Sequence, residues 1–300
     1  MVTAVVDGIK TNYIRQGTGP VLLMMAPRAF DSSLESWKRG KWHEMQAIES
    51  LSEHFTIVAY DRRESGESGG RLEVLDWRLF ARQAKLLLEH LNIERSLLLG
   101  VCMGVSVANQ FAAVYPEACA GLILVHPVGG HRWKKRMHLF FDRHLDFVHS
   151  QGLEALRQRA ASGRSFMDDP ECGPWSSVMG RDSAFAARLA SSDLDDYIRI
   201  VGASRDGMFP DTFVSGPVAA DLLRIDVPAS IWPGDDSSHS TSSAQQLREL
   251  LPRMQYWDLH PTRQTPAAML EKIVEFADAV QNDAVPPSPA IGSPPMPLRR

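Results

Sequence analysis

The stretch Leu97-Leu98-Leu99-Gly100-Val101-Cys102-Met103-Gly104-Val105-Ser106 decides how the fold of this chain is interpreted. A short apolar run, typical of a buried strand, ends in Gly-x-Cys-x-Gly, and a helical segment follows at once. Because a strand that turns this sharply into a helix crowds the positions on either side of its central residue, those positions need glycine. The pattern is that of a nucleophile elbow carrying a thiol, at a helix N-terminus that stabilises a thiolate.

A buried structural cysteine is the alternative interpretation of Cys102. Cysteine is among the most buried residue types, and a lone cysteine beside an apolar strand is usually part of a core. The motif alone does not distinguish a nucleophilic cysteine from a buried structural one, so the choice depends on patterns in the rest of the chain.

The composition is that of an ordinary globular protein. Of its 300 residues, 44% are hydrophobic and 23% are charged. A net charge of −4 gives no reason to expect nucleic acid or an anionic membrane as a partner. The three cysteines, Cys102, Cys119 and Cys172, lack metal-ligand spacing, so we expect reduced thiols and neither a metal nor another cofactor.

The chain also lacks the patterns of membrane insertion and export. Residues 1–7 have neither the basic start nor the apolar core of a signal peptide. No apolar run approaches the roughly 18 residues that a membrane span needs. We therefore expect a cytoplasmic protein that acts on a small molecule, and a homodimer stays open as its assembly.

Strand-like and helix-like segments alternate along most of the chain. Strands are predicted over residues 2–6, 11–15, 21–25, 55–60, 96–99, 121–126, 227–234 and 255–259. Helices are predicted over residues 37–51, 76–91, 103–115, 242–251 and 267–280. This rhythm predicts an α/β fold with a mostly parallel sheet covered by helices on both faces.

Residues 128–223 interrupt the rhythm. The segment is charged and helical in pattern, with a middle rich in Gly, Pro and Asp at residues 168–174. Because it is too long for a loop, we predict an inserted helical cap or lid between two parts of one core, residues 1–127 and 224–282. Residues 283–300 contain six prolines and no periodicity, which predicts a disordered tail.

With these motifs in order, the chain resembles the α/β-hydrolase fold family over about residues 2–280. Asp7-Gly8-Ile9-Lys10 resembles the opening hairpin of the family, and residues 60–68 (Tyr-Asp-Arg-Arg-Glu-Ser-Gly-Glu-Ser) resemble its Asp-x-Arg-Gly-x-Gly-x-Ser turn. The elbow, Tyr115-Pro116-Glu117 and Leu122-Ile123-Leu124 follow in the family's order. The resemblance implies a catalytic triad in the order nucleophile, acid, base, and it favours Cys102 as the nucleophile over a core role.

The acid of that triad is expected directly after a late strand. Gly234-Asp235-Asp236 occupies this position, and Asp236 stands four residues before Ser240, at the spacing that the family's loop usually has. Asp236 is therefore preferred, with Asp235 as its rival.

The base is expected after the final strand, where the resemblance selects His260. Leu259 precedes it where the family usually has Gly. His239 competes because it is close to Asp236, but three residues along the same loop it is expected to reach the elbow poorly. In this arrangement His260 takes the proton of Cys102, and Asp236 orients the imidazole ring.

The oxyanion hole is where the chain departs most from the family. One donor is expected to be the backbone N–H of Met103. The second normally follows a His-Gly after the strand at residues 21–25, but here the chain reads Ala26-Pro27-Arg28, and proline has no N–H. Either Arg28 supplies the amide or the hole has one backbone donor. The Arg28 guanidinium is also a candidate for gripping a substrate carboxylate or enolate oxygen.

Two further residues are candidates for the substrate pocket. His126, at the end of a strand, is favoured as a pocket residue over a core histidine. Trp133, in the insertion, is a candidate apolar wall, with helix packing as the alternative.

These observations predict a hydrolase with a Cys-His-Asp triad. A thiolate suits activated carbonyl substrates: an ester, a lactone, a thioester or the C–C bond of a diketone, cleaved through an acyl-thioester intermediate. Two alternatives stay open at this point. The same cysteine suits an acyltransferase or cyclase, and the altered residues 25–27 are compatible with a non-catalytic module that binds a small molecule.

Overall fold

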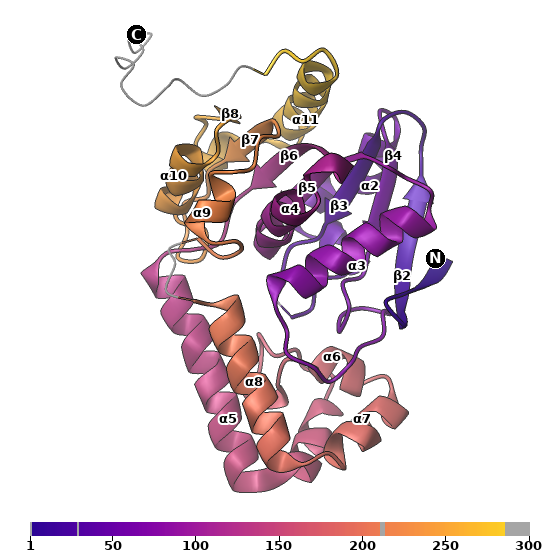
Figure 1. Cartoon of the computed structure of the whole chain (residues 1–300), viewed down its shortest axis with the longest axis vertical. Helices are drawn as coiled ribbons and strands as arrows, with labels where there is room; N and C mark the ends of the chain where they lie inside the picture. Colours follow the sequence, from indigo (N-terminus) through magenta and orange to yellow (C-terminus); the bar gives the residue numbers. More distant parts are fainter. Residues whose placement is uncertain (1, 29, 211–213, 286–300) are drawn as a thin grey trace.

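A central β-sheet organises the molecule, which we describe from a computed structural model covering residues 2–28, 30–210 and 214–285. Its eight strands lie in the order β1-β2-β4-β3-β5-β6-β7-β8 (Figure 1). Only the pairings of β1 with β2 and of β2 with β4 are antiparallel in the described part of the chain. The strands are β1 (Val2–Val6), β2 (Ile9–Gln16), β3 (Val21–Met25), β4 (Thr56–Tyr60), β5 (Ser96–Val101), β6 (Cys119–Val125), β7 (Ala229–Trp232) and β8 (Met254–Tyr256). The predicted mostly parallel α/β fold is confirmed.

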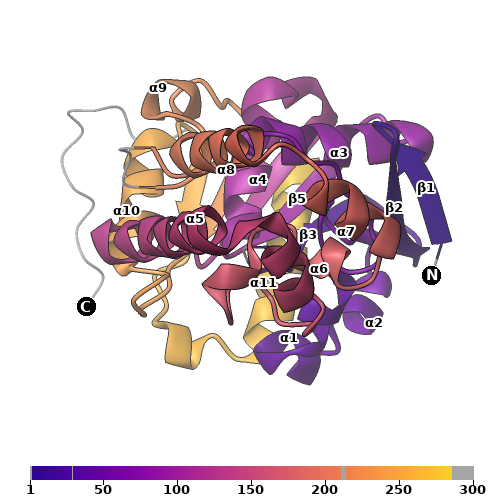
Figure 2. The same cartoon turned by 90° about the horizontal axis from the view of Figure 1, so that it is seen from below.

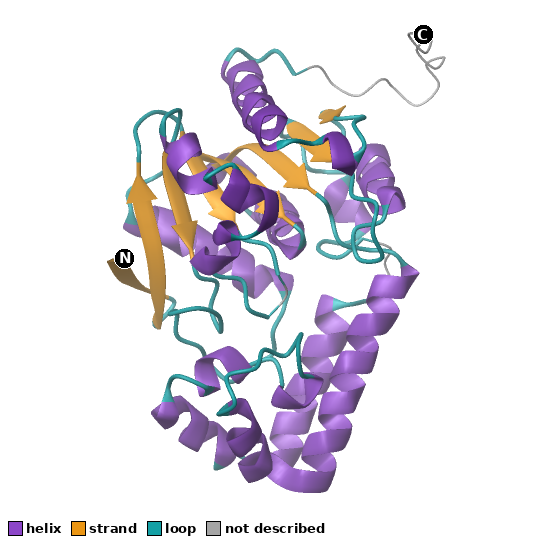
Figure 3. Cartoon of the chain, turned by 180° about the vertical axis from the view of Figure 1, so that it is seen from behind, coloured by secondary structure: helices purple, strands orange, loops and turns teal. Residues whose placement is uncertain are grey.

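Helices cover both faces of this sheet (Figures 1 and 3). One face carries α3 (Trp77–His90), α4 (Met103–Val114) and α10 (Thr241–Leu250), and the other carries α1 (Gly40–Glu44), α2 (Ala47–Ser52) and α11 (Pro266–Gln281). Because side chains alternate along a strand, β5 sends Leu98 into the first core and Leu97 and Leu99 into the second. The central strands are therefore buried on both sides, as their continuous apolar runs predict.

The single helix predicted over residues 37–51 is wrong. The chain forms a 3₁₀ turn over Leu34–Lys38 and then the two short helices α1 and α2. Gly40 and Gln46 both have left-handed backbone angles, with φ of 51° and 48°. A residue in that region ends a right-handed helix, so apolar periodicity alone overestimates the length here.

The segment after β6 is helical, as predicted. It contains α5 (His131–Ala160), α6 (Ser176–Met179), α7 (Ser183–Ala190), α8 (Leu194–Met208) and α9 (Ala219–Leu222). Seen from below, α5 and α8 run side by side across the end of the sheet (Figure 2). We call residues 131–208 the helical cap, and its action as a lid stays a prediction.

Several hydrogen bonds fix the helical cap to the core, among them one from Arg181 to the carbonyl oxygen of Ser68. The indole Nε1 of Trp77 donates to the carbonyl oxygen of Met208 at 2.9 Å. The amide of Leu75 donates to Oγ of Ser204 at 2.8 Å. The indole Nε1 of Trp175 donates to the carbonyl oxygen of Arg71 at 3.0 Å, and so the loop before α3 is held by several cap elements.

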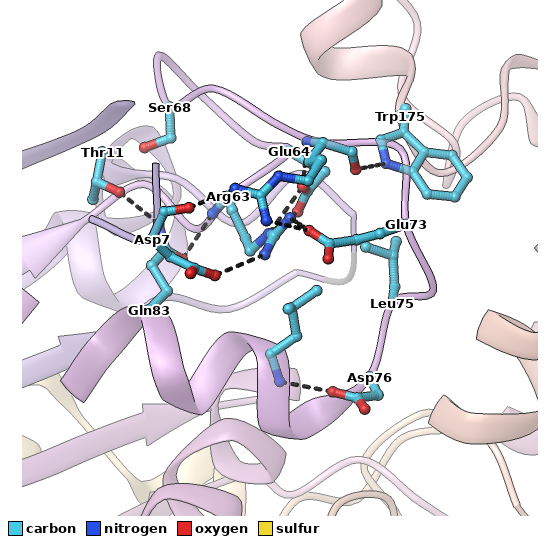
Figure 4. Close-up of polar contacts among 12 residues, drawn as sticks. Asp7, Thr11, Arg63, Glu64, Ser68, Glu73, Leu75, Asp76, Gln83 and Trp175 are labelled. Carbon is cyan, nitrogen blue, oxygen red and sulfur yellow. Dashed lines mark hydrogen bonds and ion pairs between the residues drawn. The ribbon is translucent and has the colours of Figure 1, made fainter. Parts of the chain in front are cut away.

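A buried ion cluster holds the turn that follows β4 (Figure 4). The Arg63 side chain is 1% exposed, and its Nε lies 3.0 Å from Oε1 of Glu64. Its Nη2 pairs with Glu73 and its Nη1 lies 3.9 Å from Oδ2 of Asp7, in the β1–β2 turn. Arg82 pairs with the same Asp7 from α3. The Arg63 guanidinium thus contacts acids in the β1–β2 turn (Asp7), in its own turn (Glu64) and in the loop before α3 (Glu73).

Two further predictions concern membrane-spanning helices and the C-terminal tail. In the described ranges no helix has both the length and the apolarity that crossing a membrane requires. Of the predicted disordered tail, residues 283–285 are described, and Val285 is buried against the second core. The remainder, 286–300, lies outside the described residues.

Candidate active site

Cys102 occupies a sharp turn between β5 and α4. Its backbone angles are φ 56° and ψ −121°, a strained conformation for a residue with a side chain. A Cβ on Gly104 would lie 2.2 Å from the carbonyl oxygen of Met25, and one on Gly100 would lie 2.6 Å from the carbonyl oxygen of Gly104. Both glycines are therefore sterically required, and the thiol stands at the N-terminus of α4.

Two backbone amides lie beside the Cys102 sulfur. Interactions with the N–H groups of Arg28 and Met103 lower the pKa of the Cys102 thiol. Pro27, which has no N–H, is followed by Arg28 in a positive-φ conformation (81°). Of the two options that the sequence leaves open for a second donor, the geometry favours the Arg28 amide.

His239 is the histidine that the structure brings to Cys102. The loop after β7 folds back over the end of β6, where the amide of Gly129 donates to the carbonyl oxygen of Ser238 at 3.2 Å. Gly234 allows this path, because a Cβ there would lie 2.5 Å from Cβ of His239. Nδ1 of His239 lies 2.8 Å from Oδ2 of Asp236. Its Nε2 is buried, and the thiol of Cys102 interacts with this side of the ring without an aligned hydrogen bond.

The three groups shift one another's pKa values. Burial raises the pKa of the Cys102 thiol, but the interaction with His239 and the two amides outweigh it, so the net pKa is lowered. Burial lowers the pKa of His239, but Cys102 and Asp236 raise it to about 9. Burial also raises the pKa of Asp236, and hydrogen bonds from His239 and Ser238 lower it further than burial raises it. These directions favour a thiolate–imidazolium pair at neutral pH.

The structure pairs His260, the base expected from the sequence, with Asp235 rather than with Asp236. The His260 side chain is 59% exposed, and its Nε2 lies 3.3 Å from Oδ2 of Asp235. Its Nδ1 lies 2.8 Å from Oγ1 of Thr262, within the turn that follows β8. Asp235 and His260 thus pair with each other near the surface, while Asp236 pairs with His239. The available sequence signal is Asp236-x-x-His239, since residues three apart in a tight loop can present side chains to the same side.

His126 lies beside this group, in a left-handed conformation (φ 50°) at the end of β6. Its Nε2 lies 2.7 Å from Oε1 of Gln264, and Nε2 of Gln264 donates to the carbonyl oxygens of Leu259 and Pro233. Because these two acceptors fix the amide, Oε1 has to accept and Nε2 of His126 has to carry the proton. Burial lowers the pKa of His126, so the ring is neutral with an unprotonated Nδ1. Gln264 was not predicted from the sequence.

A pocket of about 420 Å³ opens in front of the thiol. Its walls include Pro27, Arg28, Ser36, Arg39, Gly40, Lys41, Trp42, Val101, Cys102, His126, His239 and Met269. We place the candidate site here rather than at a larger hollow of about 550 Å³ beside Ile14 and Gln46, because this is the pocket that Cys102 lines.

Trp133 has a different environment from the one proposed for it as a pocket wall. It is buried in the helical cap, with its ring centroid 5.3 Å from that of Phe209. Helix packing, the alternative weighed for this residue, describes its contacts. Across the described residues, no group of three His, Cys, Asp or Glu side chains is arranged to hold a metal ion.

Comparison with known proteins agrees with this architecture. Residues 33–165, less than half of the chain, match the family model described as the alpha/beta hydrolase fold. A soluble epoxide hydrolase from Corynebacterium sp. (strain C12) is 28% identical over 109 residues, which are 36% of this chain and 35% of the relative. The matched stretch thus spans about a third of that relative's length.

Solved structures match over nearly the whole chain. An α/β hydrolase enzyme from a Medee basin deep-sea metagenome library has a TM-score of 0.63 at 18% identity, covering 92% of this chain and 97% of its own. The enol-lactonase from Burkholderia xenovorans LB400 has a TM-score of 0.60 at 17% identity, covering 92% and 100%. Together with the sheet order and the elbow, these matches identify the fold: the chain has the α/β-hydrolase fold.

Proposed function

We propose that this protein is a hydrolase that cleaves a small activated carbonyl compound, such as an ester, lactone or thioester, with Cys102 as its nucleophile. The observation that carries the proposal is the Asp236–His239 pair, whose ring lines the same pocket as the elbow thiol of Cys102. His239 is the base and Asp236 orients it. Cys102 keeps the role that the sequence predicts, and His239 replaces His260.

The first half-reaction forms an acyl-thioester. The Cys102 thiolate attacks the carbonyl carbon, and the negative charge that develops on the carbonyl oxygen is stabilised by the amides of Met103 and Arg28. The carbon–oxygen or carbon–sulfur bond to the leaving group then breaks as the His239 imidazolium donates its proton to that group. His239 is neutral at the end of this step.

The second half-reaction consumes water. Neutral His239 takes a proton from a water molecule, whose oxygen attacks the thioester carbonyl at the same amides. The carbon–sulfur bond breaks, the free acid leaves, and the thiolate–imidazolium pair is restored. Throughout, Asp236 holds the ring with Nε2 directed at the reacting atoms and stabilises its charged form.

The structural neighbours support this reaction class but do not identify a substrate. The enol-lactonase and a thermophilic esterase from Thermogutta terrifontis (TM-score 0.59, 20% identity, covering 93% of this chain and 98% of its own) are named for acting on ester-type bonds. The thiol nucleophile of this chain calls for a substrate with an equally good or better leaving group, because a thiolate is itself easily expelled from a tetrahedral intermediate.

Trapping the acyl-enzyme tests the proposal. A panel of a small lactone, a thioester and a 4-nitrophenyl ester is mixed with the protein, and the intact mass is measured within the first turnovers. We expect a mass increase equal to the acyl group, located on Cys102 by peptide mapping and lost in Cys102→Ala. Cys172→Ala is the matched control, since Cys172 is buried and its thiol pKa is raised to about 11. Full turnover by Cys102→Ala would contradict the proposal.

A further inference from the structure

Cationic side chains gather at the pocket of this acidic chain. Arg28, Arg39 and Lys41 are among the residues that line it, although the whole sequence carries a net charge of −4. Lys41 donates to the carbonyl oxygen of Pro261, which fixes its position without neutralising its charge. Asp31 is the acid that faces this group, with its Oδ2 3.5 Å from Nη2 of Arg28. Burial raises the pKa of Asp31, and the charges of Arg28, Arg39 and Arg62 oppose the rise, so this one carboxylate faces three cations.

A fourth cation, Arg62, lies beneath the elbow. Arg62 is 4% exposed, and its Nε and Nη1 are buried with no hydrogen-bond partner among the described residues. Its guanidinium carbon lies 4.4 Å from the ring centroid of Phe80. It borders a cavity of about 10 Å³ together with Ala26, two residues before Arg28, and Gly104, the residue after Met103.

An unpaired buried guanidinium is costly. A cavity of this size holds about one water molecule, which can accept a hydrogen bond but cannot neutralise the charge. Burial lowers the pKa of Arg62 to about 10, and its electrostatic interactions with Glu64, Cys102 and Asp31 oppose that fall. Its positive charge therefore acts on Cys102, which lines the substrate pocket, through a region of low dielectric constant.

We propose that the substrate is an anion, a carbonyl compound that carries a carboxylate, bound by Arg39 and Lys41 at the pocket wall and attracted by the buried charge of Arg62, whose Nε and Nη1 lack hydrogen-bond partners among the described residues. This inference rests on the proposed function, because it assigns the substrate class of the same site. Arg39 is the direct ligand best suited to the role: it lines the pocket, its interaction with Asp31 is smaller than that of Arg28, and a guanidinium binds a carboxylate through two parallel hydrogen bonds. Arg62 acts as a positioning residue.

Two alkylating reagents of nearly equal size test the substrate charge without a turnover assay. Iodoacetate and iodoacetamide both form a carbon–sulfur bond to a thiolate and release iodide, and only iodoacetate is an anion. The ratio of their second-order rates at Cys102 is measured by peptide mapping and compared with the ratio for N-acetylcysteine amide. The ratio is the iodoacetate rate divided by the iodoacetamide rate. A change in the pKa of the thiol alters both rates equally, so it leaves the ratio unchanged.

We expect the ratio in the wild-type protein to exceed that of the reference thiol. Arg62→Met should lower the ratio about tenfold, the factor that corresponds to losing one interaction with a charged group. Arg62→Lys, which keeps the charge, should stay near the wild type. The double variant with Arg39→Gln and Lys41→Gln should lower the ratio about fivefold or more, since exposed Arg39 and half-buried Lys41 are each worth less than a fully buried charge. Arg78→Met, an exposed change on α3, is the matched control.

The outcomes separate the two proposals. Rapid alkylation of Cys102 with a ratio equal to that of the reference thiol would overturn the anionic substrate and leave the nucleophile intact. If neither reagent modifies Cys102 faster than the buried Cys119, both proposals fail. Should Arg62→Met not fold, the wild-type ratio and the variant at residues 39 and 41 decide. A matched pair of esters, 4-nitrophenyl hemiglutarate and 4-nitrophenyl valerate, then extends the test to kcat/KM, where the same variants should affect only the first.

Discussion

Nδ1 of His239 lies 2.8 Å from Oδ2 of Asp236, three residues earlier in the same loop. Oδ1 of the same carboxylate accepts the backbone amides of Ser238 and His239 at 2.7 and 2.9 Å. The carboxylate therefore fixes both the loop and the ring, and the ring reaches Cys102 because the loop turns back over the end of β6. A short loop thus supplies both the candidate acid and the candidate base.

The two histidines make a matched pair of substitutions. His239→Ala should lower the rate of Cys102 acylation by about a hundredfold or more, since a positioned acid–base group contributes roughly 10²–10⁴. His260→Ala should change it less than about twofold, because His260 is exposed and pairs with Asp235. Pre-steady-state release of 4-nitrophenol measures both. A large loss in His260→Ala with little change in His239→Ala would restore the assignment made from the sequence.

The pH dependence of alkylation reports the pair directly. The pKa of Cys102 lies below its ordinary value because of His239 and the two amides, so the iodoacetamide rate should rise at lower pH than for a free thiol. Above this inflection the rate should stay level until His239 loses its proton near pH 9. In His239→Ala the imidazolium is absent while the burial remains, so the inflection should move to higher pH, toward or beyond the ordinary thiol value of about 8.5. Superimposable profiles would argue against a thiolate–imidazolium pair.

Two neighbouring carboxylates provide a second matched pair. Against the effect of burial, Cys102 and, after it, Asp236 raise the pKa of His239 to about 9. Asp236→Asn removes the second of these, so it should lower that pKa part of the way toward the ordinary value. Asp235→Asn should leave the pKa of His239 unchanged, because Asp235 faces His260. NMR titration of the ring protons measures the pKa of His239 in each variant. A shift produced by Asp235→Asn alone would assign the acid to the rival carboxylate.

Sequence reasoning predicted the fold because the fold is determined by local patterns. The apolar runs of the central strands and the glycines around Cys102 can be interpreted without knowing which distant residues they meet. The Asp236 position also follows from spacing within one loop. His239 was set aside because its position depends on contacts with Gly129 and Gly234, which only the folded chain reveals.

The same limit applies to the cap and to the buried polar groups. Trp133 is a large apolar residue of the kind that lines pockets. In the structure it packs instead against Phe209, which lies far along the chain, within the helical cap. The sequence does not indicate that Gln264 hydrogen-bonds His126, because a single glutamine before a helix is common and does not point to a particular partner. Burial and pairing of single polar side chains are tertiary properties, and the local pattern does not encode them.

The Arg63 cluster gives a prediction about stability that is independent of catalysis (Figure 4). Arg63→Met leaves Glu64 buried without its cation, and breaking a buried pair in this way should lower the free energy of unfolding by about 3–5 kcal/mol at neutral pH. Arg82→Met removes a half-exposed partner of Asp7 and should cost less than about 1 kcal/mol. Urea titrations followed by circular dichroism measure both values.

The pH dependence of that loss distinguishes a charge effect from a packing effect. Burial raises the pKa of Glu64, and Arg63 opposes the rise. Without Arg63 the folded-state pKa of Glu64 should rise further above its unfolded value, so the folded variant binds a proton more tightly than the unfolded chain does. Its stability should then recover, relative to the wild type, as the pH falls through the folded pKa. If the stability difference is instead the same at pH 5 and pH 8, the lost methylene packing of Arg63, and not its charge, accounts for it.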